Sequence, residues 1–324
     1  MTQIKIGIVG YGNLGRGVEV GLKNHSDMEL VGIFTRRDPK QLDTTAPAYL
    51  IDDILDFKDK IDVMILCGGS KTDIPEQGPA LAEHFNTVDA YDTHALMPKH
   101  FSMMDEVAKV NKNVSVIATG WDPGLFSLNR LMQEAILPTG ETYTFWGRGL
   151  SQGHSDAVRR VPGVKKAVQY TVPDATMIED IQAGKKVDYD QKNAHEREVY
   201  VVLEADANPD VVEKTIVEMP DYFEGYRTSV SFISEETFHA NHQGMGHGGH
   251  VIRQGQTSDD TISTIEFALT LDSNPEFTAA VNIVYARAAY KLAQAEQYGA
   301  KTVFDIPPIY LSPKSRDEII KNLL

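Results

Sequence analysis

The sequence feature that most constrains the fold is a glycine-rich turn between an apolar run and a helix. Residues 4–9 are nearly all apolar and predict a strand, and residues 14–22 have the pattern of a helix. In this context the first glycine permits a tight turn, the second lets a pyrophosphate approach, and the third lets helix and strand pack closely. The helix N-terminus adds positive potential for phosphate, so we predict a dinucleotide site here rather than a glycine turn without ligand. Its residues are Gly10, Tyr11, Gly12, Asn13, Leu14 and Gly15.

Further strand and helix signals alternate through the first third of the chain. Apolar runs at residues 29–34, 63–67, 88–91 and 114–118 predict four more strands, with helical stretches among them. Such alternation is typical of a parallel sheet covered by helices on both faces. The predicted fold class is therefore α/β, with an N-terminal Rossmann-like doubly wound parallel sheet.

The pattern changes after Gly120. An aspartate is a preferred N-cap residue and a proline is preferred at the first helical position. Asp122 and Pro123 therefore predict a helix towards Leu137. Strand-like segments with antiparallel or mixed character follow at 142–146, 167–172, 197–204 and 228–233, and Asn274-Pro275 opens another helix, residues 276–297. We expect a dinucleotide-binding domain of residues 1–119 plus about 275–324, and an α+β substrate-binding and dimerisation domain of residues 120–274.

The residues after the second strand indicate which dinucleotide binds. Enzymes that use NAD place an acidic residue there for the ribose hydroxyls, but this chain has Thr35, Arg36 and Arg37. Guanidinium groups match phosphate geometry, so we predict NADP; the alternative is a solvated basic turn. Residues at the carboxyl ends of later strands are predicted to line the cofactor as well: Cys67, Gly68, Gly69, Ser70, Tyr91, Asp92, Thr119, Gly120, Trp121, Asp122 and Pro123.

Composition excludes several classes of protein. The 324-residue chain has a formal net charge of -15, which argues against non-specific nucleic-acid binding. No apolar run approaches the roughly 18 residues of a membrane-spanning helix. Cys67 is the only cysteine, so no intrachain disulfide can form, and we expect a cytoplasmic protein without a secretory signal.

Several stretches, in order along the chain, resemble the meso-diaminopimelate dehydrogenase family. They extend almost from end to end, and their combination is specific although each motif is short. The stretches are residues 9–15, 73–77, 119–124, 145–147, 151–156, 219–223, 247–250 and 311–313. The resemblance implies an NADP-dependent amino-acid dehydrogenase that forms a homodimer in the cytosol. It places substrate-binding residues at Asp92, Asp122, Trp146, Gln152, Gly153, Thr171, Arg197, His247 and Asn274.

These residue types also suit the substrate, which has two carboxylates and two ammonium groups. Arg197 with Thr171 and His247 can hold the distal carboxylate, and Asn274 can add a neutral hydrogen bond. Asp92 and Asp122 are the candidate catalytic residues, because either carboxylate can accept from the reacting amine or position water. His154 is a third candidate for that role.

Each assignment has a structural alternative. Asp122 and Asn274 could only cap helices, Arg197 could be a strand-edge charge, and Trp146 could belong to the core. His239, His242, His247 and His250 could bind a metal, but the pattern of metalloproteases is missing. We expect no metal and interpret residues 247–250 as a glycine-rich substrate loop, loosened by Gly246, where the family pattern has proline.

The predicted reaction is reversible oxidative deamination of the D-centre of meso-2,6-diaminopimelate, giving L-2-amino-6-oxopimelate (tetrahydrodipicolinate) and ammonium in lysine and peptidoglycan precursor metabolism. Two other functions remain open: an NADPH-dependent imine reductase of the dihydrodipicolinate reductase type, and a non-catalytic NADP sensor. Fold alone does not separate them, since similar scaffolds carry many functions.

Overall fold

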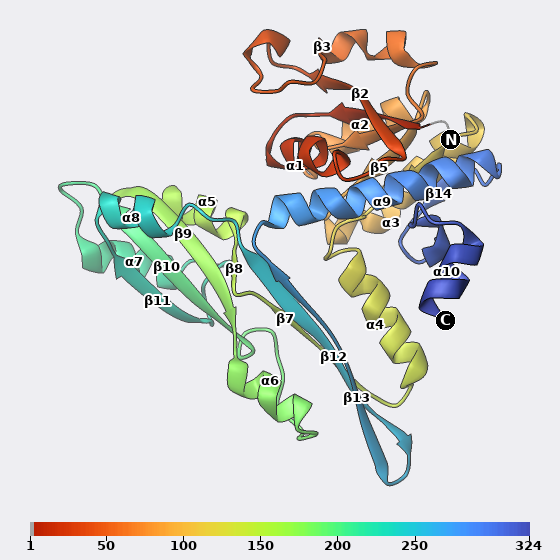
Figure 1. Cartoon of the computed structure of the whole chain (residues 1–324). Coiled ribbons are helices and arrows are strands. Elements are labelled where there is room, and N and C mark those ends of the chain that lie inside the picture. Colours follow the sequence, from red (N-terminus) through yellow and green to blue (C-terminus); the bar gives the residue numbers. More distant parts are fainter. Residues whose placement is uncertain (1–2) are drawn as a thin grey trace. The chain divides into compact units, whose positions relative to one another are not determined.

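The computed structural model describes residues 3–324 and divides into two compact units (Figure 1). Unit 1 comprises Met1–Leu128 and Pro275–Leu324, and unit 2 comprises Asn129–Asn274. Within the described residues, no helix is long and apolar enough to cross a membrane.

Unit 1 contains a seven-stranded sheet in which all neighbouring strands run parallel. The strand order is β14-β6-β5-β4-β1-β2-β3, so the chain starts in the middle and builds outward in both directions. This confirms the predicted Rossmann-like sheet, in which ligands bind at the carboxyl ends of the strands. The strands are β1 (Ile4–Val9), β2 (Met28–Thr35), β3 (Ala48–Leu50), β4 (Val63–Leu66), β5 (Asn86–Asp89), β6 (Val114–Val116) and β14 (Gly299–Lys301).

Helices cover both faces of this sheet because its strands are apolar on both. Ile6 and Ile8 pack in one cluster with α1 (Asn13–Leu22) and α9 (Asn274–Gln294), the long helix that runs along the sheet in Figure 1. Val9 and Met64 pack on the other face with α2 (Ile74–Ala82). Each fully buried side chain of this size contributes about 1.5–3 kcal/mol. The remaining helices of this unit are α3 (Met97–Val110) and α10 (Arg316–Leu323).

Unit 2 contains two smaller sheets. The first has the order β11-β10-β9-β8, antiparallel except for the parallel pair β10–β11, and the second has the order β13-β12-β7 and is antiparallel. The strands are β7 (Gly140–Trp146), β8 (Gly149–Leu150), β9 (Val164–Pro173), β10 (His195–Leu203), β11 (Arg227–Phe232), β12 (His247–Ser258) and β13 (Thr261–Leu271). The helices are α5 (Gln152–Arg159), α6 (Ala175–Gln182), α7 (Pro209–Val217) and α8 (Glu235–Asn241).

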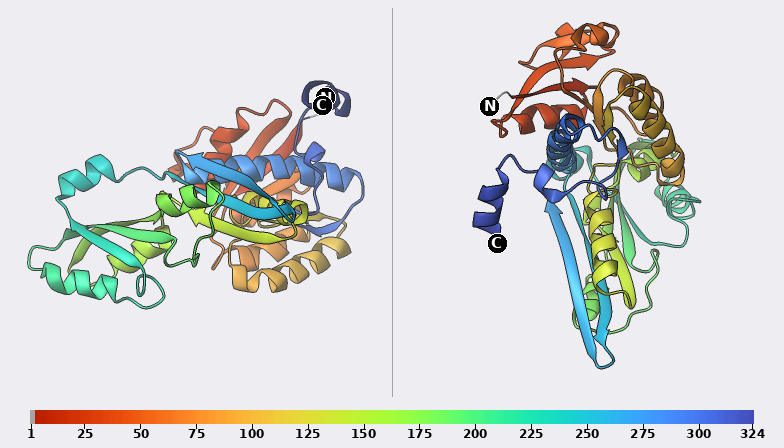
Figure 2. Two further views of the ribbon diagram at one scale, coloured as in Figure 1. Left: turned by 90° about the horizontal axis from the view of Figure 1, so that it is seen from below. Right: turned by 90° about the vertical axis from the view of Figure 1, so that its right-hand side faces the viewer.

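The prediction of a glycine-rich loop at residues 247–250 is wrong, because these residues begin β12. Figure 2 shows β12 and β13 as a long light-blue ribbon. Glycine is depleted in strands, so the sequence pattern did not indicate that β12 begins here. Here the lack of a side chain is needed, since a Cβ on Gly248 would lie 2.3 Å from the carbonyl oxygen of Leu269 on the paired strand.

The interpretation of Asp122 as an N-cap and Pro123 as the first helical residue is also wrong. The helix is α4 (Leu125–Ile136), and Gly124 precedes it with φ of 133°, a value outside the helical region. The backbone N–H of Leu125 donates to the carbonyl of Gly120 at 3.2 Å. The helix therefore starts two residues later than predicted, directly after the turn at Gly124.

Candidate functional site

A cavity of about 310 Å³ lies at the carboxyl ends of β1, β2 and β4 in unit 1. Ligand pockets in proteins begin at about this size. The cavity brings together nine residues that the sequence predicted for the cofactor: Gly10, Tyr11, Gly12, Thr35, Arg36, Arg37, Cys67, Gly68 and Gly69. Sequence reasoning missed five other lining residues: Val9, Phe34, Ile51, Asp73 and Gln77.

The three glycines of the motif have different surroundings. Gly10 has φ of 89°, a conformation that favours glycine, and a Cβ on Gly15 would lie 2.3 Å from the carbonyl oxygen of Gly10. A Cβ on Gly12 would meet no protein atom within 4 Å. Internal packing thus explains the first and third glycines. The open space at Gly12 lies where a phosphate would approach the N-terminus of α1.

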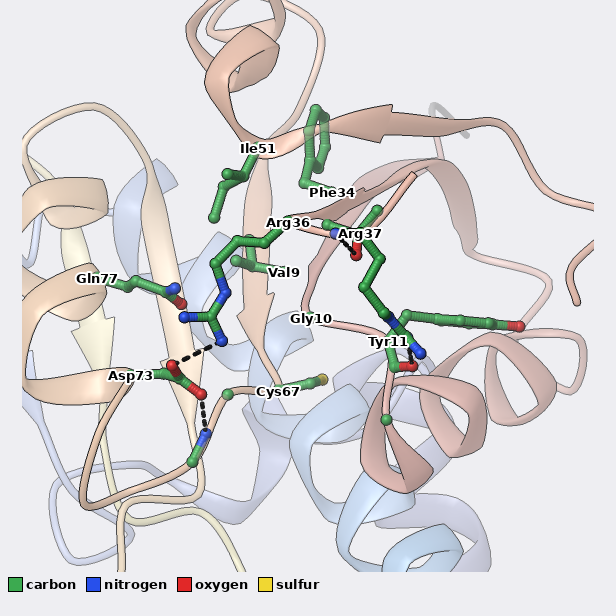
Figure 3. A pocket seen from close by; sticks show the side chains of 14 residues that line it. Val9, Gly10, Tyr11, Phe34, Arg36, Arg37, Ile51, Cys67, Asp73 and Gln77 are labelled. Carbon is green, nitrogen blue, oxygen red and sulfur yellow. Dashed lines mark hydrogen bonds and ion pairs between the residues drawn. The ribbon is translucent and has the colours of Figure 1, made fainter. Parts of the chain in front are cut away.

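Two arginine side chains diverge from the end of β2 across this cavity (Figure 3). Arg36 is 67% exposed and forms an ion pair with Asp73 at 2.9 Å. Arg37 donates from its guanidinium to the carbonyl of Tyr11, and its backbone N–H donates to the Thr35 hydroxyl at 3.1 Å. Arg37 therefore stabilises the glycine turn. Arg36 forms a surface ion pair, a kind of interaction that contributes little to stability and rearranges easily.

The other predicted cofactor residues lie outside the lining of this cavity. Asn13, Leu14 and Gly15 belong to α1, and Tyr91 and Asp92 follow β5. The backbone N–H of Asp92 donates to the hydroxyl of Ser70 at 3.2 Å, so the segments after β4 and β5 are in contact. The remaining predicted residues follow β6: Thr119, Gly120, Trp121, Asp122 and Pro123.

In unit 2, strand register brings Arg197, Thr171 and His247 into one cluster. Arg197 on β10 is paired with Thr171 on β9, which is paired in turn with Gly149 on β8. The guanidinium of Arg197 donates to the Thr171 hydroxyl, and a Cβ on Gly149 would lie 2.2 Å from the ring of His247. The absence of a side chain at position 149 therefore lets the histidine ring lie against the strand.

Arg197 is a buried cation without an anion. Its side chain is 7% exposed, its guanidinium carbon lies 4.2 Å from the ring centre of Tyr226, and its Nε has no hydrogen-bond partner. It forms no ion pair with any residue in the described range 3–324. Burying an uncompensated charge is costly, so this arrangement favours binding of an external carboxylate or similar anion.

Histidines near this cation are held neutral. Burial, with the positive charge of Arg197, lowers the pKa of His154 to about 4. Burial also lowers the pKa of His195 and of His247. Neutral rings near Arg197 add no further positive charge, and they can donate or accept hydrogen bonds at neutral pH.

The remaining predicted substrate residues of unit 2 lie on several elements. Trp146 ends β7, and its backbone N–H donates to Nε2 of His195 at 2.9 Å. Gln152 and Gly153 are exposed in the first turn of α5, and a Cβ on Gly153 would meet nothing within 4 Å. Asn274 begins α9, and its backbone N–H donates to the carbonyl of Met245 at 2.9 Å.

The four histidines considered for a metal contact different side chains. Those of His239, His242 and His250 are close to Glu235, Tyr170 and Glu266, and His247 packs against Gly149. Across the part of the chain that the structure describes, no group of three or more His, Cys, Asp or Glu side chains could hold a metal ion.

Known proteins resemble the chain along its whole length. Residues 120–273 match the family described as diaminopimelic acid dehydrogenase C-terminal domain. The chain is 56% identical over 326 residues to the meso-diaminopimelate D-dehydrogenase of Lysinibacillus sphaericus, covering 100% of both. A solved structure, C. glutamicum DAP dehydrogenase in complex with DAP, matches with 48% identity, a TM-score of 0.92 and 100% of both chains. The engineered D-amino acid dehydrogenase bound to NADP+ matches with 46% identity, a TM-score of 0.86 and 100% of both chains.

Proposed function

The chain belongs to the meso-diaminopimelate dehydrogenase family, and from that premise we propose that it catalyses the NADP-dependent oxidative deamination of the D-centre of meso-2,6-diaminopimelate. The reaction is reversible and yields L-2-amino-6-oxopimelate and ammonium. The buried, anion-free guanidinium of Arg197 is the observation that carries this proposal. A dicarboxylic substrate supplies the missing negative charge, which a monocarboxylic amino acid bound through its reacting end does not.

NADP fits the cavity of unit 1 better than NAD. The turn at Gly12 leaves room for the pyrophosphate, and α1 has no acidic residue in its first turn that would repel it. Thr35, Arg36 and Arg37 line the same cavity, and we expect them to bind the 2′-phosphate of the adenosine ribose. Arg36 is 67% exposed in its ion pair with Asp73, so exchanging this carboxylate for a phosphate costs little.

The substrate residues divide by charge. Arg197, Thr171 and His247 bind the distal carboxylate, with Asn274 as a neutral hydrogen-bonding partner. Asp92 and Asp122 bind the reacting amine through their carboxylates. The sequence resemblance adds Trp146, Gln152 and Gly153 to the substrate-binding set, since they match the family pattern.

The chemistry follows from these roles. NADP held in the cavity of unit 1 would supply the acceptor for the hydride that leaves the D-configured carbon of the substrate. Because an ammonium group cannot release a hydride from its carbon, Asp92 or Asp122 first accepts a proton from the amine. The substrate then becomes an imine, and a water held by the same carboxylates adds to it, which releases ammonium and leaves the 2-keto acid. His154 is the third candidate for this role, but burial and the charge of Arg197 lower its pKa to about 4 and make it a weaker base than an ordinary histidine.

The proposal extends to assembly and location. We expect a homodimer, because α4 exposes Leu131, Met132 and Ile136 to 50% or more, and clustered exposed apolar side chains often mark an interface. A sedimentation-equilibrium measurement should give twice the mass of one chain. We also expect the enzyme in the cytoplasm, since its one cysteine, Cys67, offers no disulfide framework.

An absorbance assay tests the reaction. Purified protein with NADP should form NADPH with meso-diaminopimelate and with the DD isomer to a lesser extent, but not with the LL isomer, which has no D-centre. A parallel series with NAD tests the cofactor. NADP binding without turnover of any isomer would contradict the dehydrogenase assignment and leave the imine reductase and the sensor.

A further inference from the structure

A buried carboxylate that the proposed reaction does not use lies at the end of β5. Asp89 has no exposed surface, and its Oδ1 accepts hydrogen bonds from the backbone N–H of Tyr91 at 2.9 Å and of Ala118 at 3.3 Å. Tyr91 directly precedes Asp92, and Ala118 begins the segment that leads to Asp122. One carboxylate oxygen therefore links the two segments that carry both proposed proton acceptors.

The main chain of Asp89 strengthens this link. Its carbonyl accepts from the backbone N–H and from the hydroxyl of Thr119, each at 2.9 Å. The Thr119 hydroxyl also lies 2.7 Å from Oδ1 of Asn282 on α9, and both side chains are fully buried. Ala118 has φ of 58°, a left-handed conformation that alanine rarely adopts, so the segment needs such contacts to keep its path.

His100 on α3 faces the other side of the carboxylate. Its Nε2 lies 3.6 Å from Oδ2 of Asp89, an oxygen without a hydrogen bond, and its ring stacks on Tyr91 with centroids 4.0 Å apart. His100 is 3% exposed. The ring therefore covers the side of the carboxylate that no hydrogen bond holds. The imidazole thus contacts both the carboxylate and the residue that the carboxylate holds.

We propose that Asp89 is a positioning residue that fixes the spacing between Asp92 and Asp122, and that His100 keeps the Asp89 carboxylate in place. This inference rests on the proposed function. Proton transfer depends on geometry at the scale of a hydrogen bond, and an error of about 1 Å at a reacting group costs on the order of 100-fold in rate. Neither Asp89 nor His100 needs to contact the substrate for this effect.

The test compares Asp89→Ala with Asp89→Asn. The alanine variant loses the acceptor for both N–H groups, so kcat should fall by about 100-fold while the Kd for NADP stays within about threefold. The asparagine variant keeps an amide oxygen that accepts both bonds, so its kcat should return to within about threefold of wild type. The matched control is Thr87→Val, which removes the 2.9 Å bond to Ser115 between the same two strands and should leave kcat unchanged.

Hydrogen exchange measured by mass spectrometry gives a readout that does not depend on turnover. Asp89→Ala should raise exchange in peptides covering residues 90–93 and 117–123, and Thr87→Val should not. If the wild type lacks activity but this exchange pattern holds, the proposed function fails and the structural link stands. Unchanged kcat in Asp89→Ala, or equal loss in the alanine and asparagine variants, would overturn the positioning role.

His100→Phe provides a second route if Asp89→Ala does not fold. Phenylalanine keeps the stacking on Tyr91 but removes the polar ring edge that faces Oδ2 of Asp89, so kcat should fall by about tenfold. In the Asp89→Asn background the same change should cause almost no further loss, because the amide has no charged oxygen for the ring to face. Additive losses in the double variant would contradict a shared role for the two side chains.

Discussion

The two units present their candidate binding residues in contrasting ways. The cavity of unit 1 is built mainly from three short segments at the ends of neighbouring strands, and four of its lining residues are glycines. The cluster of unit 2 is built from side chains on β9, β10 and β12, which meet beside Gly149 of β8. The first arrangement suits a phosphate, which main-chain N–H groups and a helix N-terminus can bind. The second suits a carboxylate, which a guanidinium group and a hydroxyl group can bind through directional hydrogen bonds.

The largest expected effect separates chemistry from binding. Asp92→Ala and Asp122→Ala should each lower kcat by about 100- to 10,000-fold, the range of general acid–base catalysis. The Kd for NADP, measured by calorimetry, should change far less, because neither residue lines the cavity of unit 1. Unchanged turnover in both variants would remove these carboxylates from the mechanism.

Arg197→Met tests whether the cluster in unit 2 binds the distal carboxylate. Losing the cation proposed to bind the distal carboxylate should reduce kcat/KM for meso-diaminopimelate by about 100- to 1,000-fold. The same change should leave Tm unchanged or raise it, since a buried charge without an anion is replaced by an apolar side chain of similar length. A clear loss of Tm would mean that Arg197 is structural, and retained selectivity for the full substrate would mean that the carboxylate binds elsewhere.

Arginine variants test the cavity of unit 1. Arg36→Ala should weaken NADP binding by about 10- to 100-fold and leave NAD binding unchanged, because it removes one charged hydrogen bond to the 2′-phosphate. Arg37→Ala should weaken both dinucleotides, since Arg37 also donates to the carbonyl of Tyr11 in the glycine turn. Equal NADP and NAD affinities in the wild type would contradict this reading of the arginines.

The smallest expected effect is on how the free energy of unfolding changes with pH, through His154 in unit 2. His154 takes up a proton near pH 6.5 when unfolded but only near pH 4 when folded, so the free energy of unfolding should fall as pH decreases through that window. His154→Phe should reduce this fall by about 1–2 kcal/mol after allowance for partial exposure. Ser151→Ala is the control, because it removes the same 2.7 Å hydrogen bond but keeps the titrating ring. An unchanged pH dependence in His154→Phe would contradict the lowered pKa.

The same contrast explains which features the sequence predicts. The parallel sheet and nine cavity residues could be predicted from local patterns. The glycines and the arginines each follow directly after a predicted strand in the sequence. Ile51 was missed because it follows a strand of three residues, too short to leave a pattern. Asp73 was noted only within a family motif. Its ion pair with Arg36 forms because β2 and β4, the strands that precede the two residues, lie on either side of β1.

In unit 2, prediction failed where glycine replaced the usual strand residues. Gly248 and Gly249 concealed the start of β12, although the alternating pattern of residues 261–271 is typical of a strand and could have indicated the hairpin. The contact between Gly149 and His247 could not be predicted, since it depends on the pairing of β8 with β9. The assignment of individual residues to substrate and cofactor stays a prediction.

Transfer of deuterium from specifically labelled substrate tests the central claim most directly. Meso-diaminopimelate carrying deuterium at the D-configured carbon is incubated with the enzyme and NADP, and the reduced cofactor is analysed by mass spectrometry. The account predicts one deuterium in NADPH from the D-labelled substrate and none from substrate labelled at the L-centre. Deuterium from the L-centre, or none from either, would contradict hydride transfer from the D-centre.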